Sequence, residues 1–340
     1  MVGDERPWSP AQRDDWLAAI DRWLAAVLPP LGERCAALEP VKERPWGAVL
    51  RVQTPGRPLY VKAVGPHGRH ELRLLADIAR TSPGLAPDVL ALDEVEGWVL
   101  MPDHGRAVVE IAEPAAQLDA IESLLPAYAE LQRSCAPMVE GWIAASVPDR
   151  SPARLPGLLE GLLDGRGAMG PVPIGRSEVQ RYQELLGKLA DVCDALDRSA
   201  VPRSIDHADI HGWNVLVGDG APRLIDWGDA CVSHPFSSLL VPIEWVAAKL
   251  PEGEQRAAVE RLCDAYLGPW GGAGERARLG FAVWVGYVAR ALSNDEQCAG
   301  GTPEVVRDGQ REIVALLRAW ATKAEQLDRP DELLVPVLEL

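Results

Sequence analysis

The stretch SIDHADIHGWNVLVGDGAPRLIDWGDA, residues 204–230, carries the strongest structural and functional signal in this 340-residue chain. Asp209 and Asn214 stand five residues apart in a polar, glycine-containing segment, which predicts a loop that turns both side chains into one cleft. The apolar runs VLV and LID flank the turn GDGAPR, and this pattern predicts a β-hairpin that returns Asp226 beside Asn214. Mg²⁺ prefers few protein ligands together with phosphate oxygens and water. One amide and one carboxylate are therefore a suitable protein share, and a nucleotide would supply the rest.

Each of these residues alone has an ordinary interpretation as a turn or cap residue. The chain, however, contains only two asparagines, Asn214 and Asn294, and only six histidines. A random sequence of this composition would seldom complete HxDxxxxN before a strand, a turn, a second strand and Asp-Trp-Gly. We therefore interpret His207, Asp209 and Asp226, together with Asn214, as a functional constellation that its structural context has to confirm.

HADIHGWN followed by IDWGD resembles the catalytic loop and metal-binding segment of the aminoglycoside phosphotransferase-like kinases, a branch of the protein-kinase-like fold. The resemblance implies an α+β fold of two lobes, a small β-rich N-lobe and a larger, mainly helical C-lobe. It also implies that Asp209 orients or deprotonates the acceptor hydroxyl and that His207 braces the loop. Asn214 and Asp226 would hold Mg²⁺, because Asp226-Trp227-Gly228 would stand in for the Asp-Phe-Gly of protein kinases.

A kinase also needs a strand lysine for the nucleotide phosphates and a helix glutamate that pairs with this lysine. PLYVKAV, residues 58–64, alternates like a strand and contains Lys62, one of only five lysines. HELRLLADIAR, residues 70–80, has apolar residues at helical spacing and places Glu71 in its first turn. Glu71 is the candidate partner of Lys62, although a glutamate in a first turn also favours the helix dipole.

Two further nucleotide contacts are expected. Residues 47–53 and 58–64 predict a hairpin, and PWGAV at its start would be the turn that covers the phosphates. Only Gly47 remains there of the glycine-rich loop of protein kinases, so Lys62 and the metal would carry more of the phosphate binding. By resemblance, Met101 to Asp103 form the hinge between the lobes, whose backbone would bind a purine.

Other nucleotide and metal motifs are excluded. GRGAMG, residues 165–170, satisfies GxGxxG but follows a helix-like segment, which is the reverse of the context that a dinucleotide site requires. The sequence contains no GxxxxGK[ST] loop and no HExxH or CxxC motif. We expect 165–170 to be a loop between helices.

Composition and charge are compatible with this picture and indicate a cytoplasmic location. The chain has no apolar run long enough to span a membrane, a charged and polar N-terminus unlike a signal peptide, and six scattered cysteines that are expected to be reduced thiols. Residues 1–104 carry a net charge of −3 and residues 105–340 a net charge of −13, which argues against nucleic acid as a partner. Such acidity could steer a cationic substrate, but it is more commonly a solubility feature.

The expected domain organisation has three parts. Residues 1–30 form an N-terminal helix that packs on the small lobe, with Trp16, Ile20, Trp23 and Val27 on one face. Residues 31–104 form the N-lobe with the hinge. Residues 105–340 form the C-lobe, with the catalytic loop and the acceptor-binding helices. Helices are predicted in this lobe over 112–135, 151–164, 177–198, 236–249, 253–266, 274–293 and 303–327.

The acceptor site is the least determined part. The resemblance places it among the C-terminal helices, where carboxylates could hold amino groups, although each is equally readable as a solvated charge or a cap. The candidates are Asp229, Glu244, Asp264, Asp295 and Glu296. Many relatives continue with Asp-Pro and then Asp-Leu-Ala, whereas this chain has His234-Pro235 and then Ser237-Ser238-Leu239. The carboxylate that often braces the catalytic loop from there is therefore expected to be missing.

The sequence thus predicts a small-molecule kinase that uses Mg²⁺ and moves the γ-phosphoryl of ATP or GTP to a hydroxyl of a small polar molecule. A cationic acceptor such as an aminoglycoside or amino sugar is one candidate, and a choline-like, homoserine-like or neutral sugar alcohol is another. A protein kinase is disfavoured because no Ala-Pro-Glu follows Asp226. A catalytically silent binding protein stays an alternative. It is disfavoured because the four expected residues are all present, namely Lys62, Asp209, Asn214 and Asp226. The oligomeric state is left open.

Overall fold

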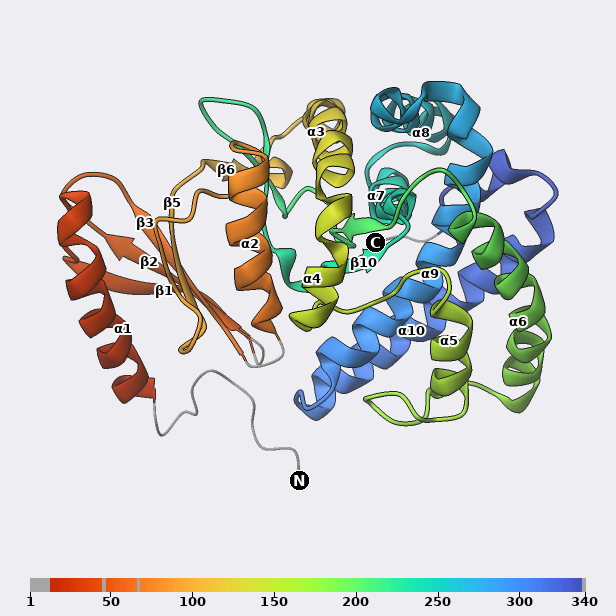
Figure 1. Cartoon of the computed structure of the whole chain (residues 1–340), viewed down its shortest axis with the longest axis horizontal. Coiled ribbons are helices and arrows are strands. Elements are labelled where there is room, and N and C mark those ends of the chain that lie inside the picture. The colour runs from red at the N-terminus through yellow and green to blue at the C-terminus, as the bar shows by residue number, and fades with distance from the viewer. Residues whose placement is uncertain (1–12, 45–46, 66–67, 338–340) are drawn as a thin grey trace.

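The structure is a computed structural model that describes residues 13–44, 47–65 and 68–337. Figure 1 shows a β-sheet at one end of the long axis and a mainly helical part at the other, with helix α2 (His70–Thr81) between them. The predicted α+β class with a small β-rich part and a larger helical part is confirmed. The charged N-terminus, the first residues of the region expected to form the N-terminal helix, and Pro45 and Trp46 of the turn expected over the phosphates lie outside the described residues.

The sheet is antiparallel, with strand order β1-β2-β3-β5-β4. Its strands are β1 (Ala37–Arg44), β2 (Gly47–Gln53), β3 (Leu59–Val64), β4 (Ala91–Asp93) and β5 (Trp98–Pro102). The predicted β2–β3 hairpin is confirmed, and Lys62 pairs with Val49 on one side and Val99 on the other. Lys62 therefore lies on a central strand, where its backbone is held from both sides.

Alternation in β2 and β3 divides the sheet into two faces. Leu50, Val61 and their equivalents point to one face, and they form a buried cluster with helix α1 (Arg13–Val27). The predicted stripe on this helix is correct for Trp16 and Ile20, but Leu24 is buried in place of Trp23 and Val27, which are only half-buried. Lys62 points to the opposite face, because side chains alternate along a strand.

Short strands position the motif of residues 204–230. Strand β8 (Val215–Val217) pairs with β9 (Arg223–Leu224), which confirms the predicted hairpin, and β6 (Arg106–Ala107) pairs with β8 on its other side. Strand β7 (Ser204–Asp206) pairs with β10 (Cys231–Ser233), a pairing that sequence reasoning did not predict. The second pairing brings the start and the end of the motif together.

The helical part contains one long sequence of helices around a common core. They are α3 (Pro114–Cys135), α4 (Val139–Ala144), α5 (Leu155–Leu163), α6 (Arg176–Asp197), α7 (Leu240–Lys249), α8 (Glu252–Leu267), α9 (Arg276–Cys298) and α10 (Pro303–Lys323). Helix α4 was not predicted. Helix α5 begins four residues later than predicted, and residues 235–239, where the predicted helix 236–249 begins, form a separate 3₁₀ turn before α7. Residues 165–170 form the predicted loop between helices α5 and α6.

No helix of the described residues is both long enough and apolar enough to span a membrane.

Candidate functional site

A buried ion-pair chain links the sheet, helix α2 and the motif. Lys62 Nζ donates to Glu71 Oε1 at 2.5 Å and to Asp226 Oδ1 at 2.7 Å. Glu71 is buried, and its Oε1 also accepts the backbone N–H of Trp227 at 3.0 Å. Burial opposes the charge of Lys62, but Asp226 and Glu71 together raise its pKa above the usual value. The structure therefore brings Lys62 and Glu71 together, as the sequence predicts, and connects both to Asp226.

Asp226 and Asn214 lie side by side at the hairpin. The backbone N–H of Ile225 donates to the carbonyl of Asn214 at 2.8 Å, and Asp226 adopts a left-handed backbone with φ of 65°. This conformation is uncommon for a residue other than glycine. Where it occurs at functional sites, the surrounding structure holds it in place. Asn214 Nδ2 donates to Asp209 Oδ2 at 2.8 Å and to the Asp209 carbonyl at 3.0 Å, so its amide oxygen is the atom available as a ligand.

These donors fit Mg²⁺ better than a metal that needs a complete protein cage. The described residues contain no group of three or more His, Cys, Asp or Glu side chains placed to hold a metal ion. Asp226 Oδ1 faces Lys62, and its partly exposed carboxylate has a second oxygen that a cation could share with nucleotide phosphates. One carboxylate oxygen and one amide oxygen match the small protein share that Mg²⁺ takes in nucleotide sites.

His207 is a buried support of the loop. Its Nε2 lies 3.0 Å from the Ile225 carbonyl, its ring packs edge-on against Trp227, and Asp209 N–H donates to its Nδ1 at 3.3 Å. Burial lowers the pKa of His207 to about 4, so the ring is neutral near pH 7. The large apolar anchor expected after Asp226 is present, because Trp227 is fully buried and donates its indole N–H to the Leu224 carbonyl.

The loop that contains Asp209 is supported by a carboxylate that the sequence analysis did not single out. This carboxylate is that of Asp206, the residue before His207. Asp206 Oδ1 accepts the Ala208 N–H at 2.8 Å and the Ser238 hydroxyl at 2.7 Å. Burial raises the pKa of Asp206 to about 6. Ser238 stands where many relatives have a carboxylate, and its hydroxyl donates to the Asp206 carboxylate. Asp206 itself lies within the stretch 204–230 quoted above.

Asp209 has a partner that the sequence did not indicate. Arg290, on helix α9, places Nη2 at 2.8 Å from Asp209 Oδ1 and donates Nη1 to the Ala208 carbonyl at 2.5 Å. Burial favours the neutral form of Asp209, but the Arg290 guanidinium holds the pKa of Asp209 well below its usual range. His211 Nε2 lies 3.3 Å from the other oxygen, Oδ2. No spacing rule connects residue 290 to a loop 80 residues earlier, so local sequence patterns carry no signal for this contact.

Of the five acceptor candidates, only Asp229 lies at this site, with Oδ2 at 3.6 Å from Arg290 Nη1. Burial, and then the charge of Asp209, raise the pKa of Asp229 to about 7.

The other four candidates contact residues elsewhere in the chain. Glu244 is buried and accepts the Tyr287 hydroxyl and the Val337 N–H. Asp295 accepts the N–H groups of Ala168 and Met169 in the loop between α5 and α6, Glu296 pairs with Arg150, and Asp264 lies 3.5 Å from Arg276. The structure therefore does not gather these four around Asp209.

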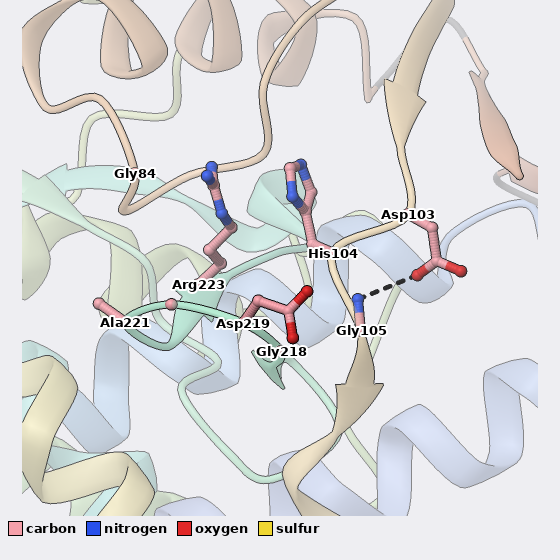
Figure 2. Close-up of a pocket in the computed structure, with 9 residues that line it drawn as sticks. Gly84, Asp103, His104, Gly105, Gly218, Asp219, Ala221 and Arg223 are labelled. Atoms are coloured by element: carbon pink, nitrogen blue, oxygen red, sulfur yellow. Dashed lines mark hydrogen bonds between the residues drawn. The ribbon is translucent and has the colours of Figure 1, made fainter. Parts of the chain in front are cut away.

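The expected hinge borders a separate pocket. Met101 and Pro102 end strand β5, and the Asp103 carboxylate accepts the Gly105 N–H at 2.9 Å. Figure 2 shows Asp103, His104 and Arg223 around this pocket of about 520 Å³. The β8–β9 turn closes its other side. Lys62, Asp209, Asn214 and Asp226 are not among its lining residues, so this hollow lies beside the hinge and away from the ion-pair chain.

Gly47 is the first residue of β2, at the end of this strand where it connects to β1. A side chain there would place its Cβ 2.9 Å from the Ala63 carbonyl, which is too close for any Cβ. The close approach of two strands therefore requires glycine at this position, whatever its role toward phosphates.

Comparison with known proteins identifies the family once this geometry is in place. Residues 46–280 match the model of the phosphotransferase enzyme family. The chain belongs to this family. The match spans the Lys62 strand, the Glu71 helix and the whole motif of residues 204–230, and it confirms the prediction of a phosphotransferase enzyme. Among curated protein sequences, none matches the chain.

Solved structures of other phosphotransferases share the fold. A choline/ethanolamine kinase family protein from Mesorhizobium loti has a TM-score of 0.61 and 20% identity, and the match covers 94% of this chain and 98% of that one. The apoenzyme of macrolide 2′-phosphotransferase MphH from Brachybacterium faecium has a TM-score of 0.57 and 19% identity, with 86% and 98% covered. The aminoglycoside phosphotransferase APH(4)-Ia, in a ternary complex with ADP and hygromycin B, has a TM-score of 0.56 and 13% identity, with 88% and 98% covered. At these identities the likeness establishes the fold alone.

Proposed function

We propose that this phosphotransferase is a small-molecule kinase that moves the γ-phosphoryl group of ATP or GTP to a hydroxyl of a small polar acceptor. The observation that carries the proposal is the contact of Lys62 with both Glu71 and Asp226, while Asp226 adjoins Asn214 and Asp209. A phosphate-binding lysine, two metal-ligand candidates and a carboxylate for the hydroxyl thus converge on one place. The nucleotide complex of the structurally similar APH(4)-Ia supports a nucleotide as donor.

Each residue then has a role in the transfer. Lys62 neutralises charge on the donor phosphates, and Glu71 fixes the lysine. Asn214 and Asp226 would hold Mg²⁺, which supplies further neutralisation of the phosphate oxygens when bound. Asp209 aims the acceptor hydroxyl in line and takes its proton as the new oxygen–phosphorus bond forms and the bond to the β-phosphate oxygen breaks. Gly47 would approach the phosphates, and the backbone of Met101 and Asp103 would bind the base.

Several classes of acceptor are compatible with this fold. An aminoglycoside or amino sugar is one candidate, and a choline-like, homoserine-like or neutral sugar alcohol is another. The domain limits 1–30, 31–104 and 105–340, and a cytoplasmic location with reduced thiols, belong to the same proposal. The six cysteines are all free thiols, which is compatible with a reducing compartment.

The experiment compares nucleotide turnover with nucleotide binding. Purified protein with Mg²⁺ and ATP or GTP is screened against kanamycin, glucosamine, choline, homoserine and glucose. Asp209→Ala is expected to abolish turnover, because it removes the group that aims the hydroxyl, while nucleotide affinity by calorimetry stays close to wild type. Asp194→Ala, on the exposed face of α6, is the matched control and keeps wild-type turnover. Turnover by Asp209→Ala within tenfold of wild type would sink the assignment.

A second variant tests the metal role. Asp226→Ala is expected to lose the Mg²⁺-dependent part of nucleotide affinity, since the remaining protein ligand, Asn214, offers only a neutral oxygen. The measurement is calorimetric titration of ATP with and without Mg²⁺. An unchanged effect of Mg²⁺ on ATP affinity in Asp226→Ala would refute the ligand role.

A further inference from the structure

Arg290 stands out because it reaches the proposed catalytic carboxylate from a distant helix. It lies on α9, its side chain is 14% exposed, and its described contacts are with Ala208, Asp209, Asp229 and Glu312. Lys62 makes its contacts with Glu71 and Asp226 instead. Lys62 and Arg290 therefore contact different sides of the same site, Lys62 at Asp226 and Arg290 at Asp209.

Arg290 helps to fix the backbone that presents Asp209. Ala208, the preceding residue, has φ of 61°, a left-handed conformation that is costly for a residue with a Cβ. Its N–H is held by Asp206 and its carbonyl by Arg290 Nη1. Both polar groups of this strained residue are thus held by buried side chains, one from each side of the loop. Because these two hydrogen bonds leave Ala208 few alternative conformations, Asp209 is held in place before any ligand binds.

The Arg290 guanidinium contacts one carboxylate oxygen of Asp209, so the two oxygens have different partners. Oδ1 faces Arg290 Nη2 at 2.8 Å, whereas Oδ2 accepts the amide of Asn214 and lies near His211. Oδ2 is thereby turned toward the residues of the proposed metal site, which is the side on which the acceptor hydroxyl must meet the γ-phosphate. The planar fork of an arginine suits this task, since it contacts a carboxylate and a carbonyl at once.

Charge balance on the acceptor side points in the same direction. Three carboxylates surround Arg290, with oxygens at 2.8 Å for Asp209, 3.6 Å for Asp229 and 3.8 Å for Glu312. Without a cation, such a cluster would attract an ammonium group of the acceptor. The chain places its own guanidinium there, against Asp209 Oδ1, and this one cation offsets one of the three carboxylates.

We propose, on the basis of the proposed kinase function, that Arg290 is the positioning residue for Asp209. Its guanidinium also fills the position against Asp209 Oδ1 that an ammonium group of the acceptor would otherwise take. An amine of the acceptor would therefore have to bind elsewhere than against this oxygen.

The first experiment measures positioning. Turnover of Mg²⁺–ATP is followed alone and with glucose, glycerate, glucosamine or kanamycin, in wild type and in Arg290→Ala. Turnover in the variant is expected to fall about 100-fold while the KM for Mg²⁺–ATP stays within about twofold, because misplacement of the hydroxyl-orienting group affects the chemical step. Guanidinium ion at a non-denaturing concentration is expected to restore at least about tenfold of the loss by filling the vacated position. Arg290→Lys keeps the charge but loses the fork, and is expected to be intermediate.

The second experiment measures charge through binding. Kanamycin, a polycation, is expected to bind Arg290→Ala at least about tenfold more tightly than wild type, because three carboxylates lose their resident cation. This gain should be smaller in the double variant Arg290→Ala with Asp209→Asn, which removes one of the three charges and so assigns the effect to this site. Arg181→Met, whose partners Glu325 and the Ala321 carbonyl lie elsewhere, is the matched control and should bind like wild type.

The outcomes separate the two proposals. Wild type that turns over no Mg²⁺–ATP under any condition contradicts the kinase function, and the Arg290 proposal fails with it. Wild type that is active while Arg290→Ala retains its turnover, or shows no rescue by guanidinium together with unchanged kanamycin affinity, contradicts the Arg290 proposal alone. Thermal melting of Arg290→Lys checks that the loop is folded in the variant with the smaller change.

Discussion

The donor half of the site, Lys62, Glu71, Asn214 and Asp226, differs in construction from the acceptor half, Asp209, Asp229, Arg290 and Glu312. In the donor half a single lysine joins two carboxylates, and Asp226 stays partly exposed toward the cleft. In the acceptor half one guanidinium lies among three carboxylates, and Asp209, Asp229 and Arg290 are almost buried. We propose that the donor half binds the nucleotide phosphates, whereas in the acceptor half a single guanidinium offsets one of three carboxylates and holds Asp209.

The largest effect is expected from breaking the donor half at Lys62. Lys62→Met removes the cation that joins Glu71 to Asp226 and leaves Glu71 buried without its charge partner. We expect turnover to fall about 100- to 1,000-fold, as for other groups that stabilise developing charge in a site. Steady-state kinetics with saturating Mg²⁺–ATP measure the loss. Lys188→Met on the exposed face of α6 is the control, and an equal loss in both variants would mean that lysine removal acts through stability alone.

A smaller effect is expected from the loop support that both halves share. Asp206→Ala removes the acceptor for the Ala208 N–H and for the Ser238 hydroxyl, so the strained Ala208 can relax and move Asp209. We expect about 100-fold lower turnover with little change in the KM for nucleotide, since a displacement of about 1 Å at the reacting group has this scale. Asp206→Asn keeps an oxygen acceptor and should stay within about tenfold of wild type. Equal turnover in the Ala and Asn variants would show that Asp206 does not position the loop.

The difference between the halves also explains what sequence could predict. The donor half depends on local patterns: a strand that contains Lys62, a helix that begins before Glu71, and a hairpin that returns Asp226 to Asn214. Spacing and periodicity encode these features directly, and the structure brings the residues together as expected. The acceptor half depends on where helix α9 packs against the loop, and that contact joins residues 80 positions apart. Asp206 was visible in the motif, but a carboxylate beside a histidine has no spacing signature, because its role follows from the buried pairing of β7 with β10.

The carboxylates proposed for the acceptor illustrate the same limit. Glu244 and Asp295 stand on C-terminal helices, as expected, but their side chains accept the Tyr287 hydroxyl and three backbone N–H groups. Sequence identifies the helix that carries a charge. Packing then decides whether this charge faces a ligand or a neighbouring loop, and only the three-dimensional arrangement contains that information.

The smallest of the expected effects concerns pH and involves His234, a buried residue that belongs to neither half. Its ring is 2% exposed, its Nδ1 accepts the Phe236 N–H at 3.3 Å, and burial followed by the charge of Arg278 lowers the pKa of His234 to about 3. The unfolded chain binds a proton at this residue near pH 6.5, whereas the folded chain does so only near pH 3. The unfolded state therefore gains protons first as the pH falls, and stability is lost between about pH 6.5 and 3.

His234→Asn isolates this contribution, because asparagine can still accept the Phe236 N–H but cannot be protonated in this range. Burial also lowers the pKa of His207, with the same sign, whereas the raised pKa values of Asp206 and Asp229 act in the opposite direction. Total pH dependence is thus a sum of opposing terms, and only the difference between variant and wild type reports on His234. We expect the free energy of unfolding, measured by urea titration, to fall between pH 7 and pH 5 by about 2 kcal/mol more in wild type than in His234→Asn. Parallel pH profiles would show that His234 can be protonated in the folded protein, and hence that water reaches its ring.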